Sequence, residues 1–121
     1  TSPDLFVGNY ERDAFVAVRR SRALAALPDD CDVSSNLPNA LYGSGVDAQW
    51  SPRNTGLESN DRVDDVQVLQ RTVDREPHCL VWIDLEPRYG HLATLRQLRE
   101  RFTLDELAHD GAVTVYAIED R

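Results

Sequence analysis

The apolar run from Cys79 to Leu85, in the segment HCLVWIDL, limits the possible folds most. A strand that is apolar on both faces is typical of the centre of a parallel sheet whose faces are both covered by helices. Segments with helical spacing lie before and after this run along the chain. Alternation of helix and strand is typical of α/β proteins, so the sequence predicts an α/β fold.

Hydrophobic periodicity and turn residues predict the order of the elements along the chain. The first is a helix over residues 9–27, with Asn9 as its N-cap and Pro28 directly after its end. The later elements are predicted in the following order: a strand over 32–35, a short helix over 38–42, a strand over 48–51, a helix over 62–75, a strand over 79–85 and a helix over 92–102.

The C-terminal tail allows two interpretations. Thr103 and Glu106 have the spacing of a helix capping box, whereas Asp110-Gly111 is a hairpin signal. The period of two over residues 113–118 favours the hairpin. The predicted fold is therefore a three-layer α/β sandwich with a mainly parallel, Rossmann-like sheet of order about 2-1-3 and an antiparallel C-terminal edge hairpin.

Length and charge limit the classes of function. At 121 residues the chain forms one domain, residues 1–121, and it contains no apolar run long enough to span a membrane. The net charge of −8 disfavours nucleic acid and anionic lipid as partners. All basic residues are arginine, so no lysine is available for a Schiff base or a P-loop. The absence of methionine predicts that the chain is a processed product or a piece of a longer protein, and the second interpretation is favoured.

Cys31 and Cys79 are the only two cysteines. In a reducing compartment they would be two buried thiols, whereas in an oxidising compartment they could pair. Each lies near the start of a predicted strand, so parallel neighbouring strands would place both sulfurs at the same end of the sheet. Cys31 and Cys79 are therefore a candidate disulfide, which would contribute about 4 kcal/mol in the chain-entropy model.

A polar tip follows the first predicted strand, and a helix begins directly after it. Ser35 and Asn36 form the tip, and Pro38 marks the helix start. Such a junction exposes backbone N–H groups at the carboxyl end of a strand, where open α/β sheets bind ligands. The candidate ligand-binding residues surround the crevice expected there: Ser35, Asn36, Tyr42, Trp50, Arg53, Asp84 and Glu86.

No catalytic residue, metal ligand or cofactor site emerges from the motifs. Asp84 and Glu86 would point to one side of the sheet, where they could hold a cation or transfer protons, or simply mark where the strand leaves the core. His78, His91 and His109 lack the spacing of a metal motif, and we expect them in loops or on the surface.

Over about residues 21–118 the chain resembles the C-terminal tail of a known family. The segment ALAALPDDCDVSSNLPNALYGSGVDAQWSPR, followed by a helix, HCLVWIDL, a further helix and DGAVTVYAIE, is similar to the soluble tail of polytopic actinobacterial membrane proteins. Those proteins are grouped with the GT-C, polyprenyl-phosphate-dependent glycosyltransferases. The matching features are Pro28, Ser35-Asn36, Pro38, Ala40-Leu41-Tyr42, Gly45 and Pro52.

The resemblance implies an extracytoplasmic domain at the cell membrane, attached to a transmembrane region of the same protein. In GT-C enzymes the catalytic aspartate lies in an early extracytoplasmic loop, so the resemblance assigns no catalytic residue to this chain. It implies a non-catalytic domain of a membrane glycosyltransferase-like protein that binds acceptor glycan, lipid-linked sugar or a partner. Amide and acidic side chains beside an aromatic ring suit sugar hydroxyls and ring faces.

Two alternatives remain open at this point. A stand-alone α/β domain could bind a phosphorylated or carboxylated metabolite through the helix start near Pro38 and through Arg53. The chain could also be a structural or interaction module without a ligand.

Overall fold

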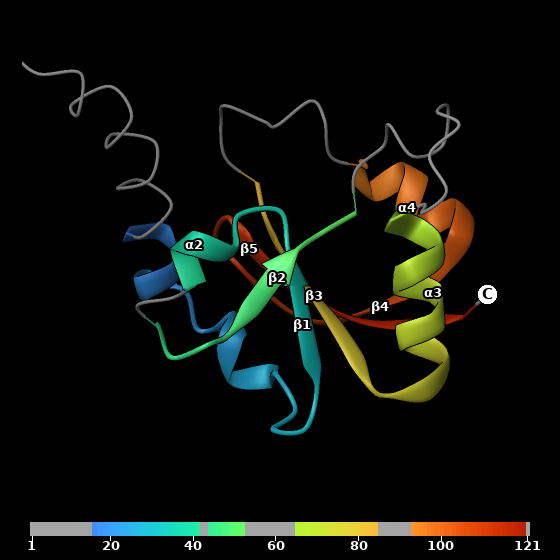
Figure 1. Ribbon diagram of the computed structural model, residues 1–121. Coiled ribbons are helices and arrows are strands. Elements are labelled where there is room, and N and C mark those ends of the chain that lie inside the picture. The colour runs from blue at the N-terminus through green and yellow to red at the C-terminus, as the bar shows by residue number, and fades with distance from the viewer. Residues whose placement is uncertain (1–15, 42–43, 53–64, 85–92, 121) are drawn as a thin grey trace, which may run out of the picture.

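The computed structural model describes residues 16–41, 44–52, 65–84 and 93–120. Within them the chain forms an α/β fold around one five-stranded mixed sheet of order β2-β1-β3-β5-β4 (Figure 1). The strands are β1 (Asp32–Ser35), β2 (Ala48–Trp50), β3 (His78–Ile83), β4 (Phe102–Asp110) and β5 (Val113–Asp120). The helices are the 3-10 helix η1 (Ala23–Ala26), α2 (Pro38–Leu41), α3 (Asp65–Arg75) and α4 (Leu95–Arg101).

The predicted strand order 2-1-3 is confirmed. β1 lies between β2 and β3 and runs parallel to both. The register places Val33 of β1 opposite Cys79 and Ser35 opposite Val81. The carboxyl ends of β1 and β3 therefore lie side by side, at the edge of the sheet where the ligand site was predicted.

The predicted C-terminal hairpin is also confirmed. β4 and β5 are antiparallel neighbours, and Gly111 takes the positive φ of +61° in the turn that joins them. β5 pairs antiparallel with β3, so the sheet has two parallel and two antiparallel pairings and is mixed rather than mainly parallel. Thr103 and Glu106 lie in β4, so the capping-box interpretation is wrong for them, and the capping box lies instead at Thr94 and Gln97.

The helix predicted over residues 9–27 is wrong at its C-terminal end. Residues 9–15 lie outside the described residues, residues 16–20 are helical, and η1 follows after a break. Asp110 of the hairpin explains the break, because its Oδ2 accepts a hydrogen bond of 2.6 Å from the Arg22 backbone N–H. Ser21 Oγ donates to the Asp110 carbonyl at 3.0 Å. The bond from the Arg22 N–H to Asp110 takes the place of a helical one, whereas the Ser21 N–H keeps its helical bond to the Ala17 carbonyl at 3.1 Å.

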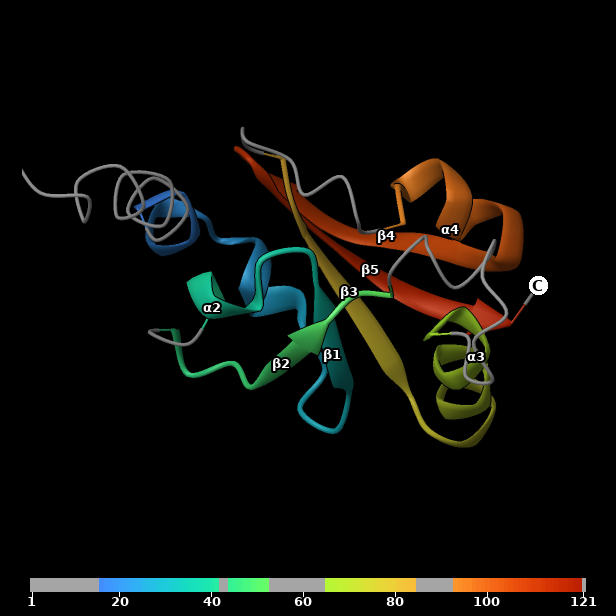
Figure 2. The ribbon, with the colours of Figure 1, turned by 45° about the horizontal axis from the view of Figure 1, so that its top comes forward.

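The core consists of two apolar clusters that use alternate residues of β3. Val81 and Ile83 belong to a cluster with η1 and α2, whereas Leu80 belongs to a cluster with α3 and α4. Figure 2 shows α2 and η1 well separated from α3 and α4 across the strands. β3 is buried on both faces, as its apolar run predicted.

Cys31 and Cys79 form a disulfide in the structure, with their Cα atoms 6.0 Å apart. The bond joins the chain directly before β1 to the start of β3, at the edge of the sheet opposite the carboxyl ends. Within the part of the chain that the structure describes, no helix is both long and apolar enough to cross a membrane.

His78 is a buried residue, so its predicted surface position is wrong. Its side chain is only 2% exposed, and its Nε2 lies 2.8 Å from Ser34 Oγ. Burial lowers the pKa of His78 below its ordinary value of 6.5, and the nearby Asp32 carboxylate opposes that shift only partly. The folded protein therefore favours the neutral imidazole.

Acid is expected to destabilise the fold through His78. The unfolded chain takes up the proton at a higher pH than the folded chain does, so the free energy of unfolding falls as the pH falls below about 6.5. For one group the slope stays below about 1.4 kcal/mol per pH unit. Urea unfolding at a series of pH values around this one measures the slope.

A His78→Gln variant is the control, because glutamine can bond Ser34 but does not titrate. Its free energy of unfolding should be flatter than that of the wild type below about pH 6.5. The Glu76 carboxyl acts in the opposite direction, since a hydrogen bond to Asp32 and then repulsion by it raise the pKa of Glu76. The contribution of Glu76 to the free energy of unfolding therefore rises as the pH falls. It is the same in the wild type and in the variant, so it does not affect the comparison of their slopes. Equal slopes for the wild type and His78→Gln would contradict the prediction.

Candidate functional site

A cavity of about 530 Å³ lies at the carboxyl ends of β1 and β3. The end of β3, the turn of the β4–β5 hairpin, the start of β5 and the start of α4 form its walls. Side chains with hydrogen-bonding groups or aromatic rings line it: Asn36, Trp82, Asp84, Thr94, Arg96, His109, Thr114 and Tyr116. The structure thus has a cavity at the edge of the sheet where the sequence predicted a ligand site.

Asn36 lines the cavity and also joins β1 to β3. Its Nδ2 donates to the Ile83 carbonyl at 2.7 Å, and its Oδ1 accepts from the Ile83 backbone N–H at 2.8 Å. The side-chain amide thus bonds the Ile83 backbone as the backbone of a neighbouring strand would. Asn36 therefore fixes the relative position of the two strand ends beneath the cavity.

Ser35 is completely buried and does not line the cavity. Its Oγ accepts a hydrogen bond of 3.0 Å from the Leu37 backbone N–H, and its carbonyl accepts one of 2.8 Å from the Ser51 N–H. A hydroxyl that bonds the backbone two residues on is typical of a turn. In the structure Ser35 shapes the turn from β1 into α2.

Asp84 lines the cavity at the end of β3, and its side chain is exposed. Its backbone N–H donates to the Ala112 carbonyl at 2.8 Å, which ties the end of β3 to the hairpin turn. Among the predicted site residues that the structure describes, Asn36 and Asp84 both line this cavity.

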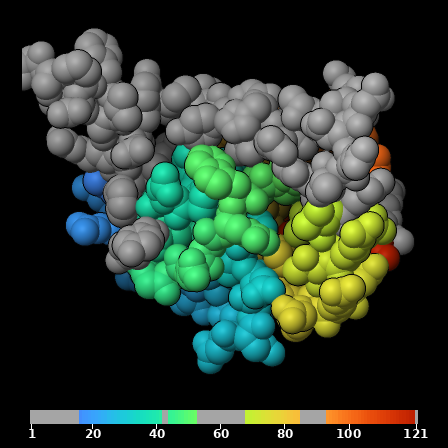
Figure 3. All heavy atoms as spheres, viewed as in Figure 1, coloured from blue at the N-terminus to red at the C-terminus, as the bar shows by residue number. Residues whose placement is uncertain are grey.

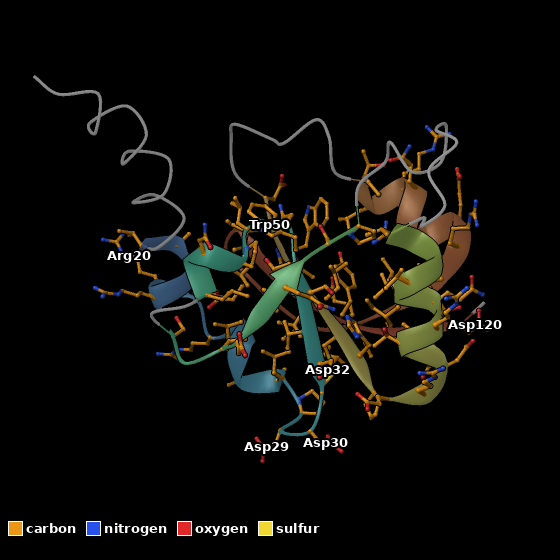
Figure 4. All side chains as sticks on the ribbon, viewed as in Figure 1. Arg20, Asp29, Asp30, Asp32, Trp50 and Asp120 are labelled. Atoms are coloured by element: carbon orange, nitrogen blue, oxygen red, sulfur yellow. A yellow bond between two sulfur atoms is a disulfide. The ribbon has the colours of Figure 1, made fainter. Side chains whose placement is uncertain are left out.

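Trp50 lies apart from this cavity, at the end of β2 (Figure 4). It is 46% exposed and borders a smaller hollow of about 270 Å³, together with Ser34, Gln49 and residues of α3. Figure 3 shows the green atoms of β2 and the yellow-green atoms of α3 on either side of this hollow. Gln49 and Ser34 share one face of the sheet, since Gln49 Nε2 lies 3.5 Å from Ser34 Oγ.

Three predicted site residues, Tyr42, Arg53 and Glu86, lie outside the described residues. The carboxylate pair predicted from Asp84 and Glu86 therefore stays a prediction. Within the described ranges, no group of three or more His, Cys, Asp or Glu side chains is placed to hold a metal ion.

The hairpin and α4 supply site residues that the sequence reasoning missed. His109 Nδ1 lies 2.6 Å from Thr114 Oγ1 across the hairpin, and both residues line the cavity. Tyr116, on the same face of β5 as Thr114, accepts a hydrogen bond of 3.4 Å from Arg99, whose guanidinium lies 5.8 Å from the ring centroid. The Asp110-Gly111 signal predicted the hairpin, but no local pattern placed it beside β3.

The cavity combines aromatic side chains with hydroxyl, amide and carboxylate groups, the Arg96 guanidinium and the His109 imidazole. This combination suits a small polar ligand, because the rings provide apolar contact and the polar groups fix the orientation. Comparison with protein-family models, with curated protein sequences and with solved structures finds no match to this chain. The inference of function therefore depends on the geometry of the cavity and on the chemistry of its walls.

Proposed function

We propose that this domain binds a sugar unit of an acceptor glycan or lipid-linked sugar, as a non-catalytic extracytoplasmic part of a membrane glycosyltransferase-like protein. The observation that carries the proposal is the cavity at the carboxyl ends of β1 and β3. Its volume of about 530 Å³ falls within the range of small-molecule sites. Open α/β sheets bind their ligands at this edge.

The chemistry of the cavity walls supports a sugar ligand. Trp82, which is half-buried, offers ring surface to the apolar face of a pyranose, while Asp84 can accept hydrogen bonds from its hydroxyl groups. Thr94 and Thr114 add hydroxyl groups that both donate and accept. The net charge of −8 favours such a ligand over one with several phosphates.

The disulfide supports an extracytoplasmic location, because disulfides persist in oxidising compartments and are rare in the cytosol. The location at the cell membrane and the attachment to a transmembrane region rest on the family resemblance. We also propose that the two core clusters on either face of β3 belong to a three-layer sandwich. Helices in both clusters support this arrangement.

An Asp84→Asn variant is expected to weaken sugar binding at least about tenfold, because hydrogen bonds to a charged acceptor are stronger than those to a neutral one. The measurement is titration of the protein with a panel of neutral mono- and disaccharides. Amide shifts of Gly111 and Ala112, which line the cavity, report binding at this site. An Asp105→Asn variant is the matched control, because Asp105 is exposed on β4 and does not line the cavity.

The same titration with inorganic phosphate and citrate tests the metabolite alternative. Binding of these anions without binding of any sugar would overturn the proposal in favour of that alternative. If no sugar and no anion shifts the amides or the melting temperature, the cavity is not a site for either class. A ligand at 100 times its dissociation constant adds about 2.7 kcal/mol, so even a weak ligand is detectable.

A further inference from the structure

A series of hydrogen bonds runs from the N-terminal helical segment to the walls of the cavity. Ser21 Oγ donates to the Asp110 carbonyl at 3.0 Å, and the Arg22 N–H donates to Asp110 Oδ2 at 2.6 Å. Ser21 Oγ also accepts a hydrogen bond of 3.1 Å from the Ala23 N–H at the start of η1. Two consecutive residues of the N-terminal segment, Ser21 and Arg22, thus hold Asp110 of the hairpin, and Ala23 in turn holds the Ser21 hydroxyl.

The series continues along the rim of the cavity. Gly111 and Ala112, directly after Asp110, form part of the cavity wall. The Asp84 N–H donates to the Ala112 carbonyl at 2.8 Å, and Asn36 bonds Ile83, the residue before Asp84, through both atoms of its amide. The described part of the rim is therefore linked from the N-terminal segment through the hairpin and β3 to the end of β1.

Asp110, the last residue of β4, joins the sheet to the N-terminal segment. It pairs with Val113 at the last position of the hairpin ladder, and it does not itself line the cavity. Its two neighbours, His109 and Gly111, do line it. η1 also packs against both β4 and β5, so the N-terminal segment contacts the hairpin through this packing as well as through Asp110.

We propose that Asp110 is a positioning residue for the cavity, through which residues 16–26 hold the hairpin turn where it shapes the ligand site. The turn is a two-residue connection at the end of the ladder, where strands open most easily. The hydrogen bonds at Asp110 restrict the opening of the turn. The turn therefore already has the position of the cavity wall before a ligand binds. The ligand part of this inference rests on the proposed function, whereas the coupling between the N-terminal segment and the turn does not.

The coupling is reciprocal by thermodynamic linkage. If the position of residues 16–26 changes the affinity of the cavity for its ligand, the ligand changes the stability of the contact at Asp110 by the same factor. A bound sugar is therefore expected to slow hydrogen exchange at the Arg22 amide, which donates to Asp110. A force or a partner that moves the N-terminal segment would change ligand affinity in turn.

Hydrogen exchange in the free protein tests the coupling without any ligand. An Asp110→Ala variant is expected to raise the exchange rate of the Asp84 amide about tenfold, because the turn that carries its acceptor loses its anchor. An Asp110→Asn variant keeps an oxygen acceptor for the Arg22 N–H and is expected to restore most of the protection. The control is Asp105→Ala on the same strand, away from the contact.

The Leu80 amide in the middle of β3 distinguishes local from global opening. If Asp84 and Leu80 exchange faster by the same factor in Asp110→Ala, the variant has lost stability as a whole and the coupling is refuted. Unchanged exchange at Asp84 refutes it as well. Sugar affinity measured on the same variants adds the second test: a loss in Asp110→Ala that Asp110→Asn rescues supports the positioning role. If no sugar binds the wild type, the proposed function fails, and the exchange result still decides the coupling.

Discussion

Replacing both Cys31 and Cys79 with alanine is expected to lower the free energy of unfolding by about 4 kcal/mol. The disulfide closes a loop with a sequence separation of 48, and the entropy that it removes from the unfolded chain grows with the length of the loop. A domain of this size is stable by only about 5–15 kcal/mol, so the loss is a large fraction of the total. Denaturant unfolding of the two proteins under oxidising conditions measures the difference.

The reduced wild type is the matched comparison. A reductant should destabilise the wild type by a similar amount and leave the double alanine variant unchanged, because only the wild type has a bond to lose. If the reductant shifts both proteins equally, or neither, the disulfide does not contribute to stability in the way the loop model requires. The comparison also separates the bond from the packing of Cys79, which is almost completely buried, because reduction keeps its sulfur atom whereas alanine removes it.

The strands and their order were predictable because their signals are local. The polar tip after Val33 and the apolar run at Cys79 identify two strands. Segments with helical spacing between successive strands predict parallel pairing, because a helical crossover returns the chain to the same end of the sheet. The register was not predictable to the residue. Val33 faces Cys79 rather than a residue further along β3, because the pairing depends on how both strands pack against the helices.

The interrupted N-terminal helix shows where local signals fail. The spacing of apolar residues continues past Arg20, so nothing in that segment alone indicates a break. The break depends on Asp110, which is 88 residues further along the chain than Arg22. A tertiary hydrogen bond of this kind overrides helix propensity, which is worth only about 0.5 kcal/mol per residue.

The sequence predicted the position of the candidate site better than it predicted the residues that line it. The strand-to-helix junction predicted a site at the carboxyl ends of β1 and β3, and Asn36 and Asp84 do line a cavity there. The other wall comes from the β4–β5 hairpin and from α4. Its position depends on β5 pairing with β3, which no pattern in the hairpin itself specifies. Sequence reasoning also assigned Asn36 to ligand binding alone and missed its role in the fold.

An Asn36→Ala variant is expected to lose about 2–4 kcal/mol of folding free energy. The substitution removes both hydrogen bonds between Asn36 and Ile83. Because Ile83 is almost completely buried, the backbone N–H and C=O of Ile83 are then left without a partner. An unsatisfied buried polar group costs about 1–3 kcal/mol. Asn39→Ala is the matched control, since Asn39 is exposed on α2 and alanine there is a better helix former.

An Asn36→Asp variant tests the role of each atom of the amide. The carboxylate can still accept from the Ile83 N–H, but it places a second acceptor against the Ile83 carbonyl, so the variant should be destabilised at neutral pH. Repulsion from that carbonyl raises the pKa of the new carboxyl in the folded state above the ordinary value of about 3.9. Its stability relative to the wild type should therefore recover as the pH falls through the raised value, because the protonated carboxyl can donate to the carbonyl. If Asn36→Asp stays equally destabilised from neutral pH to about pH 4, the Nδ2 donor is not what the fold requires at this position.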